Sequence, residues 1–210
     1  MKLYDFTLAP NPRRARIFLA EKGVELEVVQ VAIRDGAQFD PAFRAINPNC
    51  TVPVLQLDDG TILNDSSAIC RYIEEIYPEP PLLGRDSLEK ALVENWLRRV
   101  ELEGYQAVAE IRRNSLERFK DRGVPGPLPI QQIPALVERG RKRLGAFFEM
   151  LDARLGESAF VAGSSFSAAD IAALVAVEFA ANGVQERPPE GLAALKSWHD
   201  KVSARPSAAA

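Results

Sequence analysis

Two short stretches of this sequence carry residues suited to holding an extended peptide. The first is Val52-Pro53, at the mouth of an apolar run, where a proline loses a ladder hydrogen bond unless it lies at a strand start or a sheet edge. A cis bond between these two residues would turn the preceding carbonyl and amide outward, so that a peptide could pair with them like an added strand. The stretch therefore predicts an edge for peptide pairing.

The second stretch is Asp65-Ser66, directly before an amphipathic segment. A helix that begins here offers a hydroxyl, backbone N–H groups and its positive end, which suit a carboxylate, while the Asp65 carboxylate suits an ammonium group. An edge for a peptide bond, a site for a carboxylate and a site for an amine together match the needs of γ-glutamyl-cysteinyl-glycine, which is glutathione.

The elements that must position these stretches alternate between strands and helices over residues 1–77. Strand patterns occupy 2–6, 25–31, 52–57 and 61–63, and helical patterns occupy 13–22 and 67–77, with a short helix within 38–45 and a proline-rich turn at 9–12. The order βαβ followed by ββα is that of the thioredoxin fold. We therefore predict a thioredoxin-like domain over 1–77.

The composition changes at residues 78–85, where clustered prolines cannot continue a helix and predict a linker. Over 86–210 the strand signals vanish, and helices are expected at 88–119, 133–155 and 169–181. Asp86-x-x-Glu89 and Ser167-x-x-Asp170 resemble capping boxes at two of the helix starts. The predicted fold class is α/β plus all-α, an N-terminal thioredoxin-like βαβ-ββα domain followed by an all-helical C-terminal domain that lines a second substrate site.

Composition excludes several classes of function. The net charge of −3 gives no attraction to nucleic acid or to anionic membranes, and no apolar run is long enough to span a bilayer. The single histidine, His199, rules out zinc sites built from several histidines and argues against a histidine-based catalytic centre. With only two cysteines and no CxxC spacing, a reduced, cytoplasmic protein without a metal is expected.

Several motifs resemble those of the cytosolic glutathione transferases, in particular the bacterial theta-like and nu-like members. They are N-P-x-x-x-V-P-V-L at 47–55, D-S at 65–66, the linker prolines and F-S-x-A-D-I at 166–171, and their order covers essentially the whole chain. The resemblance implies a homodimeric detoxification enzyme that uses glutathione as co-substrate and conjugates its thiolate to apolar electrophiles.

The same resemblance assigns glutathione-binding roles to named residues. It implies that the Val52 backbone, before Pro53, pairs with the cysteinyl unit, that Asp65 and Ser66 hold the γ-glutamyl end, and that Gln38 reaches the glycyl end. The chain departs from the family in having Cys50-Thr51 where Gly-Lys is frequent. Gln38 and Thr51 would then offer neutral hydrogen bonds, each contributing about 1 kcal/mol rather than the ~1.5–3 kcal/mol of a charged one.

Activating the thiol requires donors in the turn after the first strand. Lowering a thiol pKa by about two units takes about 2.7 kcal/mol of preferential stabilisation of the anion. Theta-like relatives carry serine where this chain has Ala9, whereas Asn11 resembles the asparagine of nu-like relatives. We predict Asn11 as the catalytic donor and Thr7 as the second choice, while Tyr4 is expected to point into the fold or into the contact between the domains. Asn11 between prolines is also a common turn residue.

Other activities stay open on the sequence alone. A nu-like glutathione-dependent disulfide reductase or peroxidase is favoured by Asn11, and Cys50 beside the peptide edge could form a mixed disulfide with glutathione. A non-catalytic binding or regulatory module is favoured by Ala9, which cannot donate from its side chain. The side chains available for a second substrate are Trp96, Arg99, Tyr105, Arg112 and Arg113.

Overall fold

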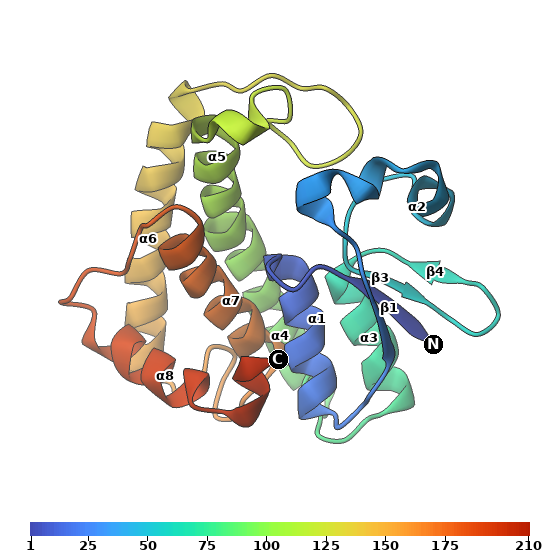
Figure 1. Ribbon diagram of the computed structural model, residues 1–210. Coiled ribbons are helices and arrows are strands. Elements are labelled where there is room, and N and C mark those ends of the chain that lie inside the picture. The colour runs from blue at the N-terminus through green and yellow to red at the C-terminus, as the bar shows by residue number, and fades with distance from the viewer. The chain divides into compact units, whose positions relative to one another are not determined.

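The structure is a computed structural model that describes residues 1–210, and the chain divides into two compact units (Figure 1). The first unit comprises Met1–Pro80 together with Val124–Pro129 and Ala210, and the second comprises Pro81–Gly123 and Ile130–Ala209. A four-stranded mixed sheet with helices makes up the first unit, and the second is helical. The predicted fold class, a thioredoxin-like domain followed by an all-helical domain, is thus confirmed.

The first unit has the thioredoxin-like order of elements. Its strands are β1 (Lys2–Asp5), β2 (Glu27–Gln30), β3 (Val54–Gln56) and β4 (Ile62–Leu63), and its helices are α1 (Pro10–Glu21), α2 (Pro41–Ile46) and α3 (Ser66–Ile76), with short turns η1 (Ile33–Asp35) and η2 (Ala37–Phe39). The strand order is β2-β1-β3-β4, in which β1 pairs parallel with β2 and antiparallel with β3, and β3 pairs antiparallel with β4.

The two faces of this sheet are covered by different helices. Tyr4 and Val54 lie opposite each other and belong to a cluster with Phe43 of α2. Successive side chains of a strand point to opposite faces, so the buried pair Leu3 and Leu55 faces the other side. There α3 packs against β3 and against α1. Because helices cover both faces, a ligand can reach the backbone at the ends of the strands and along the outer edges of β2 and β4.

Helix α1 begins earlier than its pattern suggests. We predicted a turn over 9–12 and a helix from Arg13, but the helix starts at Pro10. Prolines are tolerated in a first turn because the N–H groups there have no partner within the helix. The prediction of a turn was therefore wrong, and Asn11 is the second residue of the helix.

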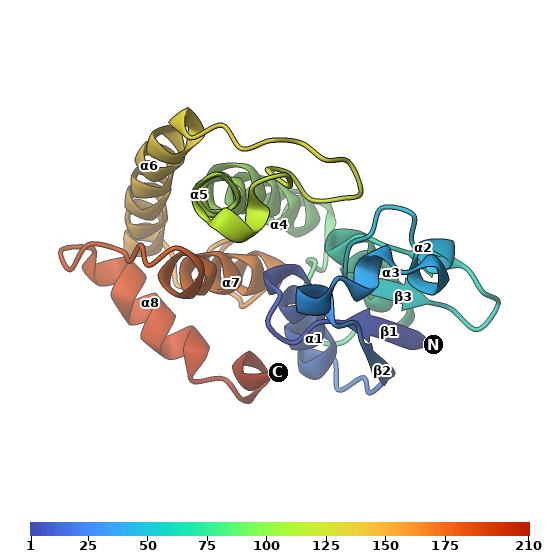
Figure 2. The ribbon, with the colours of Figure 1, turned by 45° about the horizontal axis from the view of Figure 1, so that its top comes forward.

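The second unit is built from helices of unequal length (Figure 2). They are α4 (Ser87–Arg99), η3 (Val100–Tyr105), α5 (Gln106–Ser115), η4 (Glu117–Phe119), α6 (Ala135–Glu157), α7 (Ala168–Gly183), α8 (Ala193–Ser203) and η5 (Pro206–Ala209). Helix α7 is apolar on all sides and packs against α4, α5, η3 and α8. It forms the centre of this unit, and no helix of the chain is long and apolar enough to cross a membrane.

The predicted continuous helix over 88–119 was wrong in its middle and at its end. The segment changes to a π-helical turn in η3 and stops being α-helical after Ser115. Gly104 lies against the ring of Phe147, which a Cβ on Gly104 would approach to 2.5 Å. The π-helical turn and the glycine together let α6 come close at this point.

The two predicted capping boxes differ in the structure. Ser167 and Asp170 form a complete capping box at the start of α7, which confirms that prediction. Asp86 caps α4 by accepting hydrogen bonds from the backbone of Leu88 and Glu89. The Glu89 carboxylate, however, accepts from the Arg85 backbone instead of from Asp86, because it also pairs with the Arg85 guanidinium.

Candidate functional site

The predicted peptide edge lies at one end of the sheet in the first unit. Because β1 and β3 are antiparallel with Tyr4 opposite Val54, the residues that follow β1 lie beside those that precede β3. The Val52–Pro53 bond there is cis. Val52 lies outside the ladders, and neither its N–H nor its C=O takes part in another backbone hydrogen bond of the chain. These two groups are available to an extended ligand.

A fully buried asparagine holds this edge in place. The Asn47 amide nitrogen donates to the Thr51 carbonyl at 2.8 Å and to the Thr51 hydroxyl oxygen at 3.2 Å. Its Oδ1 accepts from the Asn49 backbone N–H and from the Asn64 side chain, both at 3.1 Å. Every hydrogen of this amide group and both lone pairs of its oxygen therefore have a partner inside the protein.

These bonds join two parts of the site that are distant in the sequence. Thr51 directly precedes Val52, and Asn64 directly precedes Asp65, so Asn47 connects the peptide edge with the start of α3. The sequence presents Asn47 only as the first residue of a motif. Its role in joining the two parts depends on a hydrogen bond from Asn64, which lies 17 residues away in the sequence. No local pattern reveals such a contact.

The start of α3 combines a helix cap with unused donors. Asp65 is the N-cap, and its Oδ1 accepts from the backbone of Ser67 at 2.8 Å and of Ala68 at 3.2 Å. Its Oδ2 accepts no hydrogen bond within the chain. The hydroxyl and the backbone N–H of Ser66 likewise have no partner within the chain. An anion at this helix end can thus use Ser66, and a cation can use the second oxygen of Asp65.

The turn after β1 is fixed by a polar network around the buried carboxylate of Asp5. The Thr7 backbone N–H and hydroxyl both donate to Gln30 Oε1 at 3.1 Å. Gln30 Nε2 and Arg16 Nη1 each donate to the carboxylate of Asp5 at 2.6 Å, and Asp5 is 1% exposed. The only hydroxyl proton of Thr7 is therefore directed at Gln30.

The first turn of α1 keeps few donors. The N-cap Ala9 has no polar side chain, and its N–H donates to the Phe6 carbonyl at 2.8 Å. Pro10 and Pro12 lack an N–H. Asn11 keeps both its backbone N–H and its side-chain amide without a partner in the chain, and no acidic residue lies in this turn. The positive end of α1 thus presents Asn11 to an anion.

Gln38 lies in η2 and is 4% exposed. Its Oε1 is buried and has no hydrogen-bond partner in the protein. An unsatisfied buried polar group costs about 1–3 kcal/mol, so such groups in a folded protein often await a ligand.

The other reactive side chains of the first unit are Tyr4, Cys50 and Cys70. The Tyr4 hydroxyl donates to Gln56 Oε1 at 3.2 Å, and the ring packs edge-on against Phe43, so this side chain points into the fold as expected. Cys50 is buried with its thiol directed at the Pro48 carbonyl at 3.5 Å. Burial raises the pKa of Cys70 to about 12, which keeps that thiol protonated near neutral pH.

The fold defines a two-domain protein whose first half is thioredoxin-like and whose second half is helical. Residues 9–76 match the family model of the glutathione S-transferase N-terminal domain, and residues 134–201 match that of the glutathione S-transferase C-terminal domain. The chain is 36% identical over 212 residues to glutathione S-transferase 2 of Saccharomyces cerevisiae, covering 99% of this chain and 87% of the relative. It belongs to the glutathione S-transferase family and is a transferase, and the family uses glutathione as a substrate.

Solved structures show the same relationship. The crystal structure of Gtt2 from Saccharomyces cerevisiae superposes with a TM-score of 0.89 at 34% identity, covering 99% of this chain and 98% of that one. A class Gtt2 glutathione S-transferase of Vibrio parahaemolyticus has a TM-score of 0.84 at 35% identity, covering 99% and 95%. A maleylacetoacetate isomerase of Pseudomonas aeruginosa is 45% identical over 93 residues, which cover 43% of this chain and 44% of the isomerase.

Proposed function

We propose that this transferase binds glutathione along the Val52 edge and transfers its thiolate to an electrophile. The γ-glutamyl end binds at Asp65 and Ser66, and the glycyl end binds at Gln38 and Thr51. The observation that carries the proposal is the set of polar groups left without partners: the Val52 backbone, Ser66, the second oxygen of Asp65 and Gln38 Oε1.

Asn11 is the donor that we propose for the sulfur. Its amide and its backbone N–H can give two hydrogen bonds to a thiolate, each contributing about 1.5–3 kcal/mol because the acceptor is charged. Their sum meets the requirement of about 2.7 kcal/mol for a pKa lowered by about two units. Thr7, the second choice, has its hydroxyl directed at Gln30, so the geometry favours Asn11.

The chemical step is then a nucleophilic displacement or addition. The glutathione thiol loses its proton to solvent, the thiolate sulfur forms a bond to the electrophilic carbon, and a leaving group departs with the electron pair of the bond that breaks. The chain contributes binding, orientation and stabilisation of the thiolate.

The test of the thiolate site is an ultraviolet titration of bound glutathione. Asn11→Ala is expected to raise the pKa of the bound thiol by about one unit or more, since it removes a hydrogen bond to the anion. Thr7→Val is the matched control and is expected to leave that pKa unchanged. An unchanged thiol pKa in the Asn11 variant would exclude this residue as the donor.

Parallel assays separate the activities. Turnover of an aryl halide with little turnover of hydroxyethyl disulfide supports conjugation, and the reverse supports the disulfide reductase. Failure to bind immobilised glutathione would leave only a binding or regulatory module. The likeness to a named maleylacetoacetate isomerase favours glutathione-dependent isomerisation as a further candidate, which an assay with that substrate tests directly.

We also propose a homodimer for the transferase, working in detoxification in the cytoplasm. Leu88 and Leu92 lie one turn apart on α4 and are 69% and 40% exposed, which gives an apolar stripe for a second copy. Leu88→Glu is expected to shift the sedimentation coefficient from that of a dimer to that of a monomer. A monomeric unmodified protein would contradict this assembly.

A further inference from the structure

Arg16 connects helix α1 with the end of strand β1 in the first unit. Its Nη1 donates to the Asp5 carboxylate at 2.6 Å, and its Nη2 donates to the Thr7 carbonyl at 3.0 Å. The same Nη2 lies 3.5 Å from the Ala210 carbonyl, which belongs to the same unit. Because Asp5 is the last residue of β1 and Arg16 lies more than one turn into α1, these bonds fix the direction in which the helix leaves the strand.

Gln30 holds the same turn from the neighbouring strand. It is the register partner of Asp5 in the parallel pair of β1 and β2, and its Nε2 donates to the second oxygen of the Asp5 carboxylate at 2.6 Å. Its Oε1 accepts from both the backbone N–H and the hydroxyl of Thr7 at 3.1 Å. Arg16 therefore holds the carbonyl of Thr7 while Gln30 holds its N–H, and both side chains are joined to one buried carboxylate.

Packing contributes little to the turn itself. Leu8, at its tip, is 64% exposed, and the turn is closed by a hydrogen bond from the Ala9 N–H to the Phe6 carbonyl at 2.8 Å. The side chain and the backbone N–H of Asn11, two residues further along, have no partner in the chain. The place of Asn11 therefore depends on bonds that other residues make around it.

The network lies at the end of the sheet that carries the Val52 edge. Tyr4 lies opposite Val54 in the antiparallel pair of β1 and β3, so the residues after β1 lie beside those before β3. In the proposed complex, Val52 holds the cysteinyl unit and Asn11 meets its sulfur. A hydrogen bond weakens steeply when its donor is misaligned, so bonds between β1 and α1 decide how well a donor on α1 meets the sulfur.

From these contacts we propose that Arg16 and Gln30 are positioning residues for the thiolate, because they hold the turn after β1 and the first turn of α1 where Asn11 reaches the sulfur. The inference rests on the proposed function for the glutathione site and for the donor. Arg16 acts through Asp5 and the Thr7 carbonyl, and Gln30 acts through Asp5 and the Thr7 N–H. Neither side chain needs to touch the ligand.

The test is the ultraviolet titration of bound glutathione in two variants. Arg16→Met removes the bonds to Asp5 and to the Thr7 carbonyl. Gln30→Met is the milder variant, because it leaves the buried Asp5 carboxylate with its cation. Each variant is expected to raise the pKa of the bound thiol by about half a unit or more, which lowers the thiolate fraction and kcat near neutral pH about threefold.

The pH profile separates positioning from a general loss of structure. The deficit in kcat is expected to disappear above the pKa of the bound thiol, where every variant carries the thiolate. The KM for glutathione is expected to change less than about twofold, because the Val52 edge and the start of α3 keep their contacts. A deficit in kcat that is equal at all pH values, with an unchanged thiol pKa, would overturn the proposal.

A double variant shows whether Arg16 acts through Asn11. If it does, Asn11→Ala combined with Arg16→Met raises the thiol pKa no further than Asn11→Ala alone, because no donor is left to misplace. A rise equal to the sum of the two single effects would show that the charge of Arg16 acts on the thiolate directly. That result would overturn the positioning role.

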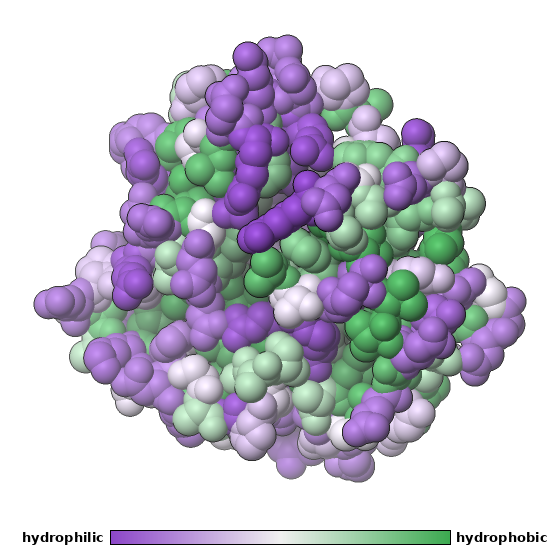
Figure 3. Space-filling model, in the orientation of Figure 1, coloured by the Kyte–Doolittle hydropathy of each residue, from purple (hydrophilic) through white to green (hydrophobic).

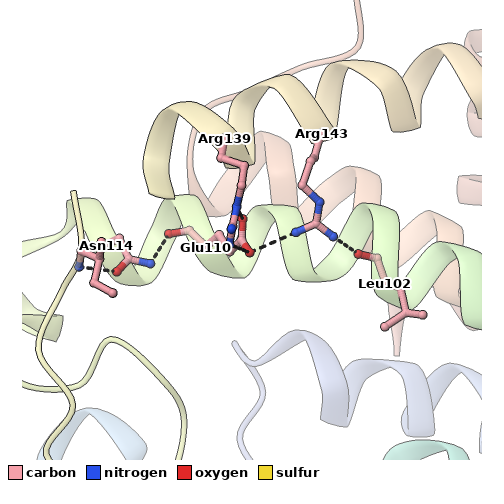
Figure 4. A network of polar contacts seen from close by, with 6 residues as sticks. Leu102, Glu110, Asn114, Arg139 and Arg143 are labelled. Carbon is pink, nitrogen blue, oxygen red and sulfur yellow. Dashed lines mark hydrogen bonds and ion pairs between the residues drawn. The ribbon is translucent and has the colours of Figure 1, made fainter. Parts of the chain in front are cut away.

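A matched control lies in the second unit (Figure 4). Arg143 on α6 resembles Arg16 because it donates both to a carboxylate, that of Glu110 at 3.0 Å, and to a backbone carbonyl, that of Leu102. This network continues through Asn114 to the end of α5, where hydrophilic residues gather on the surface (Figure 3). Arg143→Met is expected to leave the pKa of the bound thiol unchanged, since none of these residues belongs to the proposed glutathione site. An equal rise in this variant would overturn the proposal.

Hydrogen exchange without glutathione separates this inference from the function on which it rests. The reporter is the Ala9 amide, whose bond to the Phe6 carbonyl is not altered by the substitutions. Its exchange is expected to be about tenfold faster in Arg16→Met and Gln30→Met and unchanged in Arg143→Met. If glutathione failed to bind to the unmodified protein, the proposed function would fall, while this pattern would still support a network that holds the turn. Unchanged exchange in both variants would overturn the inference even in an active transferase.

Discussion

The candidate site of the first unit and the core of the second unit differ in whether their polar groups have partners within the chain. In the first unit, the Val52 backbone, Ser66 and Gln38 Oε1 are left without partners around one end of the sheet. In the second unit, the buried carboxylate of Asp170 accepts four hydrogen bonds. Polar groups without a partner can bind a ligand, whereas the paired groups around Asp170 stabilise the helical core. Substitutions in the candidate site should therefore change ligand affinity, whereas substitutions in the helical core should change the free energy of unfolding.

The largest effect is expected at Asp170, where the two oxygens accept from Val161, Trp198 and twice from Ser167 at 2.9–3.0 Å. Asp170→Ala leaves these donors unsatisfied and is expected to lower the free energy of unfolding by about 4 kcal/mol, measured by urea denaturation. Asp170→Asn keeps one oxygen and should cost about half as much. A loss below about 1 kcal/mol would contradict the role of this network.

Substituting Asn47 should change both stability and glutathione binding, because this buried residue joins the two parts of the proposed ligand site. Asn47→Ala is expected to cost about 2 kcal/mol of stability and to weaken glutathione binding about tenfold, since the peptide edge and the start of α3 lose their common support. Calorimetry with glutathione and urea denaturation measure the two effects. Asn64→Ala removes one of the bonds and should give a smaller change of the same kind. An unchanged glutathione affinity would show that Asn47 stabilises the fold but does not support ligand binding.

At Gln38, the free energy of unfolding and the affinity for glutathione are expected to change in opposite directions. Gln38→Met removes a buried oxygen that has no partner, which should raise the free energy of unfolding by about 1 kcal/mol. The same change should weaken glutathione binding severalfold, because the ligand loses a hydrogen bond. Thermal unfolding with and without glutathione shows both effects. If the variant is less stable and binds glutathione normally, the unpartnered oxygen has no role in the site.

The smallest effect concerns Cys70, whose pKa burial raises from 9.0 to about 12. Between these values the folded protein keeps a proton that the unfolded chain releases, so this thiol contributes stability below pH 9 that declines as the pH rises toward 12. Cys70→Ala should therefore flatten the fall in stability with alkaline pH, measured by urea denaturation at a series of pH values. Equal slopes in both proteins would contradict the burial of the thiol.

Local patterns were enough to predict the order of elements and the ends of several helices. The alternation of strands and helices over 1–77 and the Ser167–Asp170 capping box depend on residues close together in the sequence, and the structure contains both. The start of α1 was misplaced because two prolines read as a turn although a first helical turn accepts them.

Contacts between distant residues could not be predicted. Thr7 offers a hydroxyl in the right turn, but its partner Gln30 lies 23 residues away on another strand. Asn47 and Asn64 meet only because the hairpin brings the start of α3 back to the preceding loop. The π-helical turn at Gly104 likewise depends on the ring of Phe147, which comes from a different helix. Pairing across the fold decides which donors stay available, and a linear pattern does not contain it.

The division of the chain has a consequence for dissecting the enzyme. Val124–Pro129 belongs to the first unit although it lies between helices of the second, and a Cβ on Gly126 would be 3.7 Å from the Asn49 carbonyl. Ala210 also belongs there, and its carbonyl accepts from Arg16 at 3.5 Å. A fragment cut at Pro80 would lack both pieces, so the first unit is not encoded by one continuous stretch of the gene. Recombination between family members at Pro80 would therefore give hybrids whose first unit contains segments from both parents.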